Sequence, residues 1–344
     1  MNVSDFDYNL PKELIAQEPT EPRDHARLFV LNKEIKKEEH KHFYNIIDYL
    51  NPGDVLVRNT SKVFPARIFG KKKTGGKVEI LLLHPITDTF WKCLVGGKVK
   101  DGEKVTFNSK SIPHATLFCG DKASQEWELD FGEYSNDLPE FVKKLGSTPI
   151  PPYIDSTLSE NELRKRYQTI YAKQSGSVAA PTAGMHFTPE LIKKIEEKGV
   201  TIVDIILHVG IGTFLPVKTE KLKDHVMHAE YVKIPPHTAR VIKNAKIAGN
   251  CIVAVGTTTT RALEGAYEAV LSGEGWVGEV NIFITPGYDF KVIDALITNF
   301  HLPKSTLLAL VSAFVGREEA LLCYKEAVKK KYRFFSFGDA MFLR

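Results

Sequence analysis

Residues 176–190 (GSVAAPTAGMHFTPE) are nearly all small until His186, after which the chain opens a helix. Such a run has too little bulk to form a core, but it lets backbone N–H groups approach another molecule closely. Thr188 is the expected N-cap and Pro189 the first helical residue, which adds the positive end of a helix dipole. The pattern predicts a ligand-binding loop. The alternative is a tight structural connection whose alanines pack beneath a neighbouring element.

Two further segments combine a buried strand with a polar loop. Residues 200–207 read as an apolar, β-branched strand and lead into residues 208–214, and residues 251–255 read as a second strand followed by residues 256–260. Ligands of open α/β sheets gather at the carboxyl ends of strands, so one site assembled from all three loops is expected. The candidate ligand-binding residues in the two strand-end loops are Gly210, Gly212, Thr213, Gly256, Thr257 and Thr258.

Neither glycine segment is a standard phosphate-binding motif. Residues 210–212 lack the third glycine and the helix of a dinucleotide fingerprint, and no Gly-Lys-Ser/Thr follows a glycine loop. A P-loop is therefore excluded, and a Rossmann site is not expected.

Composition limits the class of protein. The 344 residues are 43% hydrophobic and 26% charged, enough for a large core and two domains, while the net charge of +4 does not by itself indicate a nucleic-acid partner. The four cysteines form no C-x-x-C pair, and no apolar run approaches the ~18 residues of a membrane span. We expect a soluble cytoplasmic protein without disulfides or membrane contact, with a monomer favoured.

A change in the pattern of predicted strands and helices marks the domains. Closely spaced strand signals at 78–83, 90–95, 104–107, 115–119 and 127–131 are separated by short turns, which indicates a small antiparallel β-barrel or sandwich. Elsewhere buried strands alternate with helices expected at 189–198, 237–248, 261–271 and from about 305 and 317. The predicted fold is a discontinuous α/β domain, a mixed sheet formed by residues 1–61 and 149–344, with a β-barrel inserted at 62–148.

Several longer segments of the sequence resemble one known family. Seven segments are similar to the S-adenosylmethionine:tRNA ribosyltransferase-isomerases of queuosine biosynthesis. They are the opening FDYNLPKELIAQEPTEPRDHARL, then GSVAAPTAGMHFTPEL, LHVGIGTF, MHAEYVKIP, AVGTTTTRALE, DALITNFHLPKSTLL and YRFFSFGDAMFL. The resemblance runs nearly end to end, and only the β insert carries few diagnostic words.

The resemblance implies a defined reaction. The ribose-derived part of S-adenosylmethionine would be transferred to 7-aminomethyl-7-deazaguanine at the tRNA wobble position, giving epoxyqueuosine and releasing adenine and methionine. It also implies that the chemistry starts with removal of a proton from the sulfonium-activated C5′. No metal is expected, and no cofactor beyond S-adenosylmethionine as co-substrate.

Such chemistry needs a base that removes the C5′ proton. It also needs a group that protonates or hydrogen-bonds the departing adenine, and a partner for the methionine carboxylate. The candidate acids and bases are His186, His208, His301 and Asp294, although a histidine at a strand end is often structural. Asn299, at the carboxyl end of the expected strand 295–298, is a further candidate for binding the co-substrate. Arg261, placed in the first turn of its helix, either points to solvent or contacts an anion at that N-terminus; the anion contact is favoured, which makes Arg261 a candidate for binding the co-substrate.

Basic and aromatic residues are interleaved at several places that could contact tRNA phosphates. The candidates for RNA binding are Arg23, Arg27, Arg58, Arg67, Arg164, Arg166 and Tyr167. His225 and His228 have the wrong spacing for a His-Glu-x-x-His zinc motif, so the metal interpretation is not favoured.

Two other functions compete with this interpretation. A nucleotide or sugar transferase acting on small molecules would explain the polar loops without RNA, and a non-catalytic RNA-binding protein would explain a barrel with a basic rim. The clustered His, Arg and Thr residues speak against a pure binding protein.

Overall fold

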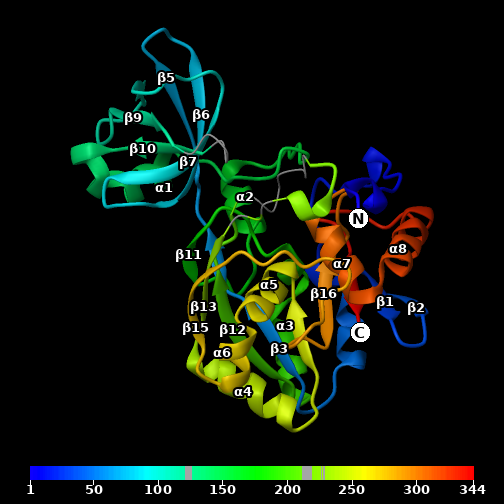
Figure 1. The fold of residues 1–344 in the computed structure, drawn as a ribbon. Helices are drawn as coiled ribbons and strands as arrows, with labels where there is room; N and C mark the ends of the chain where they lie inside the picture. Colours follow the sequence, from blue (N-terminus) through cyan, green and yellow to red (C-terminus); the bar gives the residue numbers. More distant parts are fainter. Residues whose placement is uncertain (121–125, 211–218, 226, 228) are drawn as a thin grey trace.

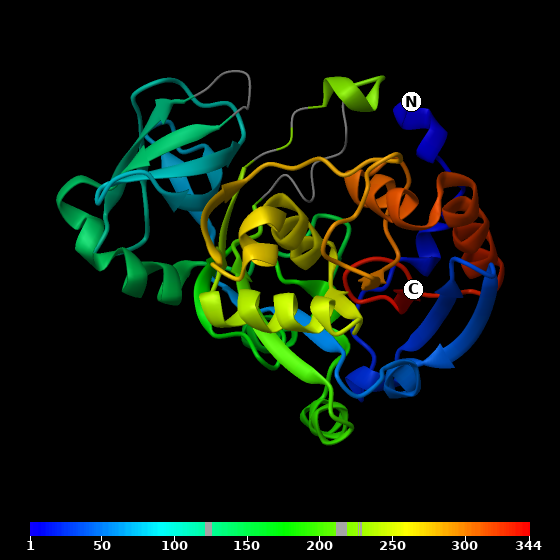
Figure 2. The ribbon, with the colours of Figure 1, turned by 60° about the horizontal axis from the view of Figure 1, so that its bottom comes forward.

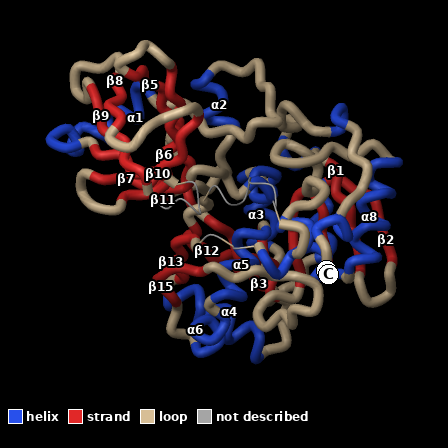
Figure 3. Tube along the Cα trace, turned by 45° about the horizontal axis from the view of Figure 1, so that its top comes forward, coloured by secondary structure: helices blue, strands red, loops and turns tan. Residues whose placement is uncertain are grey.

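The computed structural model describes residues 1–120, 126–210, 219–225, 227 and 229–344, and divides into a large α/β domain and a β-barrel (Figure 1). The α/β domain is built on a mixed sheet, and the barrel lies beyond one of its ends (Figure 3). Within the described residues, no helix is both long and apolar enough to cross a membrane.

The sheet has nine strands among the described residues. β12, β3, β14 and β16 run parallel at its centre, joined by crossover connections. The outer pairs are antiparallel except for β1 and β17, which pair in parallel. In spatial order the strands are β15 (Trp276–Val280), β13 (Glu230–Ile234), β12 (Thr201–Leu207), β3 (Val55–Asn59), β14 (Ile252–Val255), β16 (Ala295–Asn299), β17 (Ala340–Leu343), β1 (Arg27–Asn32) and β2 (Lys37–His42).

Helices cover both faces of this sheet. Because successive strand side chains alternate between faces, Val55 and Val57 join one hydrophobic cluster and Leu56 joins the other. The first cluster takes in α4 (Pro236–Ile247), α5 (Thr257–Gly265), α6 (Tyr267–Ser272), α7 (Thr306–Val315) and α8 (Arg317–Lys329), seen in yellow to red in Figure 2. The second takes in α3 (Pro189–Glu197) and the 3-10 helix η4 (Phe43–Tyr49).

The predicted β insert is confirmed as a closed antiparallel barrel. It adds one strand, β5, that the sequence did not suggest, and it has a core of its own to which α1 (Leu138–Leu145) contributes Phe141 and Val142. The barrel order is β10 (Trp127–Asp130), β7 (Phe90–Gly96), β6 (Lys77–Pro85), β5 (Arg67–Lys72), β8 (Glu103–Thr106) and β9 (His114–Cys119).

The chain enters and leaves the barrel side by side. Arg67 and Ser147 exchange backbone hydrogen bonds of 3.2 and 2.7 Å, and a Cβ on Gly146 would lie only 2.0 Å from the Pro65 carbonyl oxygen. On the sheet side, β4 (Ser61–Val63) pairs with β11 (Gln174–Ser177), and α2 (Glu160–Arg166) lies in the return segment. The two ends of the insert are therefore held close together where they join the α/β domain.

Excision of residues 66–145, with Pro65 joined to Gly146, is expected to leave a folded α/β domain. The reason is that the barrel buries its apolar residues mainly against each other, with Val178 as the contribution from the α/β domain. Circular dichroism and gel filtration of the deletion variant would check this. Aggregation with loss of the helical signal would contradict it.

Four predicted helix starts are confirmed to within a residue or two, and one is wrong. The helix expected at 261–271 is two helices: α5 begins at Thr257, after Gly256 at φ +92°, and α6 follows a break at Ala266. Glycine is required at 256 because other residues rarely adopt this left-handed conformation. Arg261 therefore lies in the second turn of α5 and not in the first.

Candidate functional site

An open pocket lies at the carboxyl ends of β14 and β16. All three loops predicted to share a site contribute to its wall, so they do lie together, and ligand binding by them stays a prediction. The lining consists of Ala180, Pro181, Thr182, Ala183, Val209, Gly256, Thr257, Thr258, Thr298, Asn299, Phe300, His301, Leu307, Phe335 and Ser336.

The N-terminus of α5 forms one side of this pocket. Thr260 is the first residue of the helix whose N–H finds a main-chain acceptor, Gly256 O, so the N–H groups of Thr257, Thr258 and Thr259 precede the first intrahelical bond. The Thr259 hydroxyl donates back to Val255 O, whereas the buried Thr258 Oγ1 has no partner among the described residues. This side of the pocket offers donors and the positive end of a helix dipole.

His301 lies on the opposite strand end and is held in place from three directions. A 2.9 Å hydrogen bond joins its Nε2 to Thr298 Oγ1. Its backbone N–H donates to Tyr324 Oη (3.1 Å), and Tyr8 Oη donates to its backbone carbonyl. Burial lowers the pKa of the imidazole to about 3, so the ring is neutral at physiological pH. Nδ1, which makes no hydrogen bond within the described chain, is the ring atom left for a ligand.

His186 does not line the pocket but lies behind Asn299. Asn299 Nδ2 donates to His186 Nε2 (3.1 Å), and Thr182 Oγ1 donates to Asn299 Oδ1 (2.9 Å). Burial and the charges of Arg333 and Arg23 lower the pKa of His186 to about 3. The histidine therefore fixes the orientation of the Asn299 amide in the pocket wall.

The two neutral histidines make stability depend on pH. The pKa of a histidine in the unfolded chain is near 6.5, whereas the pKa of His186 and of His301 in the folded protein is about 3. Between these two pH values the unfolded state therefore binds protons that the folded state does not. Each should therefore remove up to about 1.4 kcal/mol of unfolding free energy per pH unit between these limits. Urea unfolding from pH 7 to 4 should show a shallower decline for His301→Gln than for the natural protein. Equal slopes would contradict the burial of a neutral ring.

The other two candidate acids or bases lie outside the pocket lining. His208 stacks on Tyr231 with centroids 5.4 Å apart, and burial lowers its pKa. Asp294 is separated from the site because it precedes β16, whereas the pocket lies at the end of that strand. Its carboxylate accepts from Lys246 Nζ and Ile252 N, both at 2.9 Å, so it is a structural cap.

Arg261 is buried and paired, which the sequence did not suggest. Its Nη1 donates to Glu230 Oε2 (2.5 Å), and the second oxygen of Glu230 accepts from Gly210 N (3.0 Å). The sequence did not identify Glu230 as a partner of Arg261, because the two residues are 31 positions apart. The only sign of Glu230 in the sequence was an acidic residue just before the apolar strand 231–234. Gly212 and Thr213 lie outside the described residues.

Phe335 is a residue of the pocket wall that the sequence did not indicate. It has φ +75°, which is rare for a bulky side chain, and its ring meets Tyr153 edge-on with centroids 3.9 Å apart. Backbone strain of this kind persists where surrounding contacts impose it, and it concentrates at functional sites. The Phe335 N–H donates to Phe300 O, which ties this strained residue to the strand-end loop of His301.

The residues predicted to bind RNA are mostly committed to the fold. Arg23 donates to the carbonyls of Gln168 and Arg166, and Arg58 pairs with Asp204 at 2.7 Å. Tyr167 is fully buried, so the prediction that it contacts RNA is wrong. Of the remaining candidates, Arg27 packs on Tyr332, Arg67 pairs with Glu79, Arg164 pairs with Glu160, and Arg166 is half-buried.

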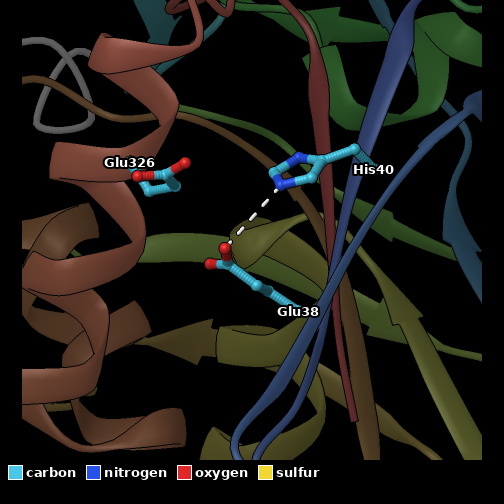
Figure 4. Close-up of side chains that lie close together, drawn as sticks. All are labelled: Glu38, His40 and Glu326. Carbon is cyan, nitrogen blue, oxygen red and sulfur yellow. Dashed lines mark ion pairs between the residues drawn. The ribbon is translucent and has the colours of Figure 1, made fainter.

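One cluster of possible metal ligands is found among the described residues, away from the pocket. Glu38 and His40 of β2 face Glu326 of α8, with 3.8 Å between His40 Nε2 and Glu38 (Figure 4). Glu326 is already paired with Lys329 and Lys330. We assign no metal to this cluster.

Comparison with known proteins shows which family this chain belongs to. Residues 3–343 match the family model described as queuosine biosynthesis protein. The chain is 53% identical over its whole length to a protein of Thermosipho melanesiensis and 50% identical to one of Thermotoga maritima, each matched over its whole length and each named S-adenosylmethionine:tRNA ribosyltransferase-isomerase.

A solved structure agrees with these sequence matches. The crystal structure of S-adenosylmethionine tRNA ribosyltransferase from Thermotoga maritima aligns with a TM-score of 0.57 and 40% identity, covering 99% of this chain and 100% of that one. The chain therefore belongs to the queuosine biosynthesis protein family and is an enzyme of the S-adenosylmethionine:tRNA ribosyltransferase-isomerase type.

Proposed function

We propose that this enzyme transfers and isomerises the ribosyl part of S-adenosylmethionine onto 7-aminomethyl-7-deazaguanine at the tRNA wobble position. The products are epoxyqueuosine in the RNA, adenine and methionine. The observation that carries the proposal is the pocket that unites the N-terminus of α5, the fixed Asn299 amide and the neutral His301. The names of the relatives supply the donor and the RNA.

The pocket suits the adenosyl part of this donor. Among the described lining residues none carries a full positive charge at neutral pH, so a sulfonium placed near His301, away from the start of α5, has no cationic side chain beside it. No cofactor beyond the donor itself is part of the proposal.

Each side of the pocket has a role in the reaction. His301 Nδ1 accepts the C5′ proton, which the neighbouring sulfonium makes acidic, and the resulting imidazolium donates it to the departing adenine. Burial keeps the His301 ring neutral, so a ring nitrogen has a lone pair that can accept a proton. The N–H groups at the start of α5 and the Thr258 hydroxyl stabilise the negative charge that develops on adenine as it leaves.

The RNA phosphates need basic groups that the fold has not used. Because Arg23, Arg58 and most of the other predicted arginines are bonded internally, the proposal gives this role to exposed lysines such as Lys62 and Lys71. Phosphate neutralisation lowers the logarithm of affinity by about 0.7–0.9 for each tenfold rise in salt per contact.

The test combines tRNA binding with turnover. We expect binding of the modified tRNA to weaken steeply with salt, and adenine release from S-adenosylmethionine to require that tRNA. Adenine release at the same rate without RNA, together with a flat salt dependence, would favour the transferase that acts on small molecules.

A further inference from the structure

The loop of small residues joins separate hydrophobic cores of the molecule. Val178 is 2% exposed and belongs to the core of the barrel, whereas Ala179 belongs to the first cluster of the α/β domain. Ala180 and Ala183 line the pocket; Ala183 packs in the second cluster and Ala180 in a smaller one. Residues 178–183 therefore reach from the barrel core to the wall of the pocket.

Ser177 and Val178 also hold the neighbouring pocket loop. Val178 N donates to Val209 O (3.2 Å), and Val209 N donates to Ser177 Oγ (3.0 Å), so the two segments are joined in both directions. The Ser177 hydroxyl donates in turn to Ala179 O (2.6 Å). Ser177 is fully buried, and Val209 lines the pocket. Two of the three loops of the pocket wall are thus fixed to each other through residues 177–178.

The same residues hold the chain where it enters the barrel. β4 pairs with β11 as far as Val63 and Ser177, and Phe64 N donates to Ser177 O (3.2 Å). The Phe64 side chain packs against the barrel core. None of the described residues that line the pocket comes from the barrel itself. Residues 177–178 are therefore a direct connection between the barrel and the pocket wall.

We propose that Ser177 and Val178 are positioning residues that couple the barrel to the pocket. While Val178 is seated in the barrel core, the hydrogen bonds of residues 177–178 hold Val209 and Ala180 in the arrangement that binds the donor. Because coupling between two parts of a protein is reciprocal, a ligand that fixes the pocket wall also stabilises the barrel. The inference rests on the proposed function for the use of S-adenosylmethionine as that ligand.

Hydrogen exchange of the full-length protein, followed by mass spectrometry with and without saturating S-adenosylmethionine, tests this coupling. Peptides from β6 and β7 should exchange more slowly when the donor is bound, although no described barrel residue lines the pocket. In Val178→Ala the peptide around Thr257 should still respond to the donor, whereas the barrel peptides should not. The donor affinity of this variant should fall by about 5-fold or more, the lower end of the usual coupling between sites.

Two further variants control the experiment. Val105→Ala removes the same two methyl groups from the barrel core, but Val105 is fully buried on β8, which pairs only with barrel strands. It should lower the stability of the barrel and leave the donor affinity unchanged, because Val178 stays seated. Ser177→Ala removes the acceptor of Val209 N without truncating a barrel-core side chain, so it should weaken donor binding and remove the response of the barrel.

The outcomes separate this inference from the proposed function. If the donor protects the pocket peptides of the natural protein but leaves barrel exchange unchanged, the coupling is overturned and the proposed function stands. An equal loss of donor affinity in Val105→Ala and Val178→Ala would also overturn the coupling, since it would show a general loss of stability. Failure of the natural protein to release adenine with modified tRNA would overturn the proposed function instead.

Discussion

The variant His301→Gln is expected to release adenine about 10²- to 10⁴-fold more slowly than the natural protein, the usual contribution of a positioned proton-transfer group. A glutamine amide can replace Nε2 in the bond to Thr298, so the fold around the strand end is kept. What the variant loses is Nδ1, the atom that faces the ligand in the proposed reaction. Single-turnover adenine release with saturating donor and modified tRNA measures the effect.

Two variants control this experiment. His301→Asn places an amide near Nδ1 but loses the bond to Thr298, so it should retain more activity if Nδ1 mainly hydrogen-bonds the ligand. His186→Gln acts on the pocket only through Asn299 and should have a smaller effect. If His301→Gln releases adenine within a few-fold of the natural rate, another group removes the C5′ proton.

The acceptor base should have the largest effect of all. A tRNA with guanine at the wobble position is expected to give no detectable product, because the exocyclic aminomethyl nitrogen is the proposed nucleophile and guanine lacks it. Loss of one pocket contact would reduce the rate by a modest factor, whereas loss of the reacting atom abolishes the reaction. Parallel reactions with the two tRNAs, with unmodified tRNA also tested for binding, measure this discrimination.

Binding of the guanine tRNA provides the control. Since phosphate contacts dominate affinity, that RNA should still bind with similar salt dependence. Transfer of a ribosyl group to guanine at a comparable rate would show that the aminomethyl nitrogen is not the acceptor.

The location of the pocket could be predicted from the sequence because it depends on local signals. Small residues at 180–183, the glycine at 256 and the polar residues after strand 295–298 each mark a strand end or a close approach, and parallel strands bring those ends together. The barrel was predictable for the same reason, since short alternating strands with turns carry their own signal.

The roles of individual side chains depended on tertiary partners and could not be predicted. His186 and His301 looked alike in the sequence, yet one lies behind Asn299 and the other in the pocket wall. Arg261 was placed one turn too early, and its partner Glu230 comes from another element.

Backbone conformation and burial explain the remaining differences. Phe335 gave no signal because its positive φ is imposed by contacts far away in sequence. Arginine side chains predicted to reach RNA, such as Arg23 and Arg58, instead satisfy carbonyls and carboxylates of the fold. Charge patterns in a sequence do not distinguish these two uses.

The most direct test of the proposed reaction is the identity of its products. Incubation of the enzyme with S-adenosylmethionine and tRNA carrying 7-aminomethyl-7-deazaguanine should release adenine and methionine in equal amounts. Mass spectrometry of the digested RNA should show a nucleoside enlarged by the ribose-derived group. S-adenosylhomocysteine, or an RNA that gains a single methyl group, would instead identify a methyltransferase and contradict the proposed ribosyl transfer.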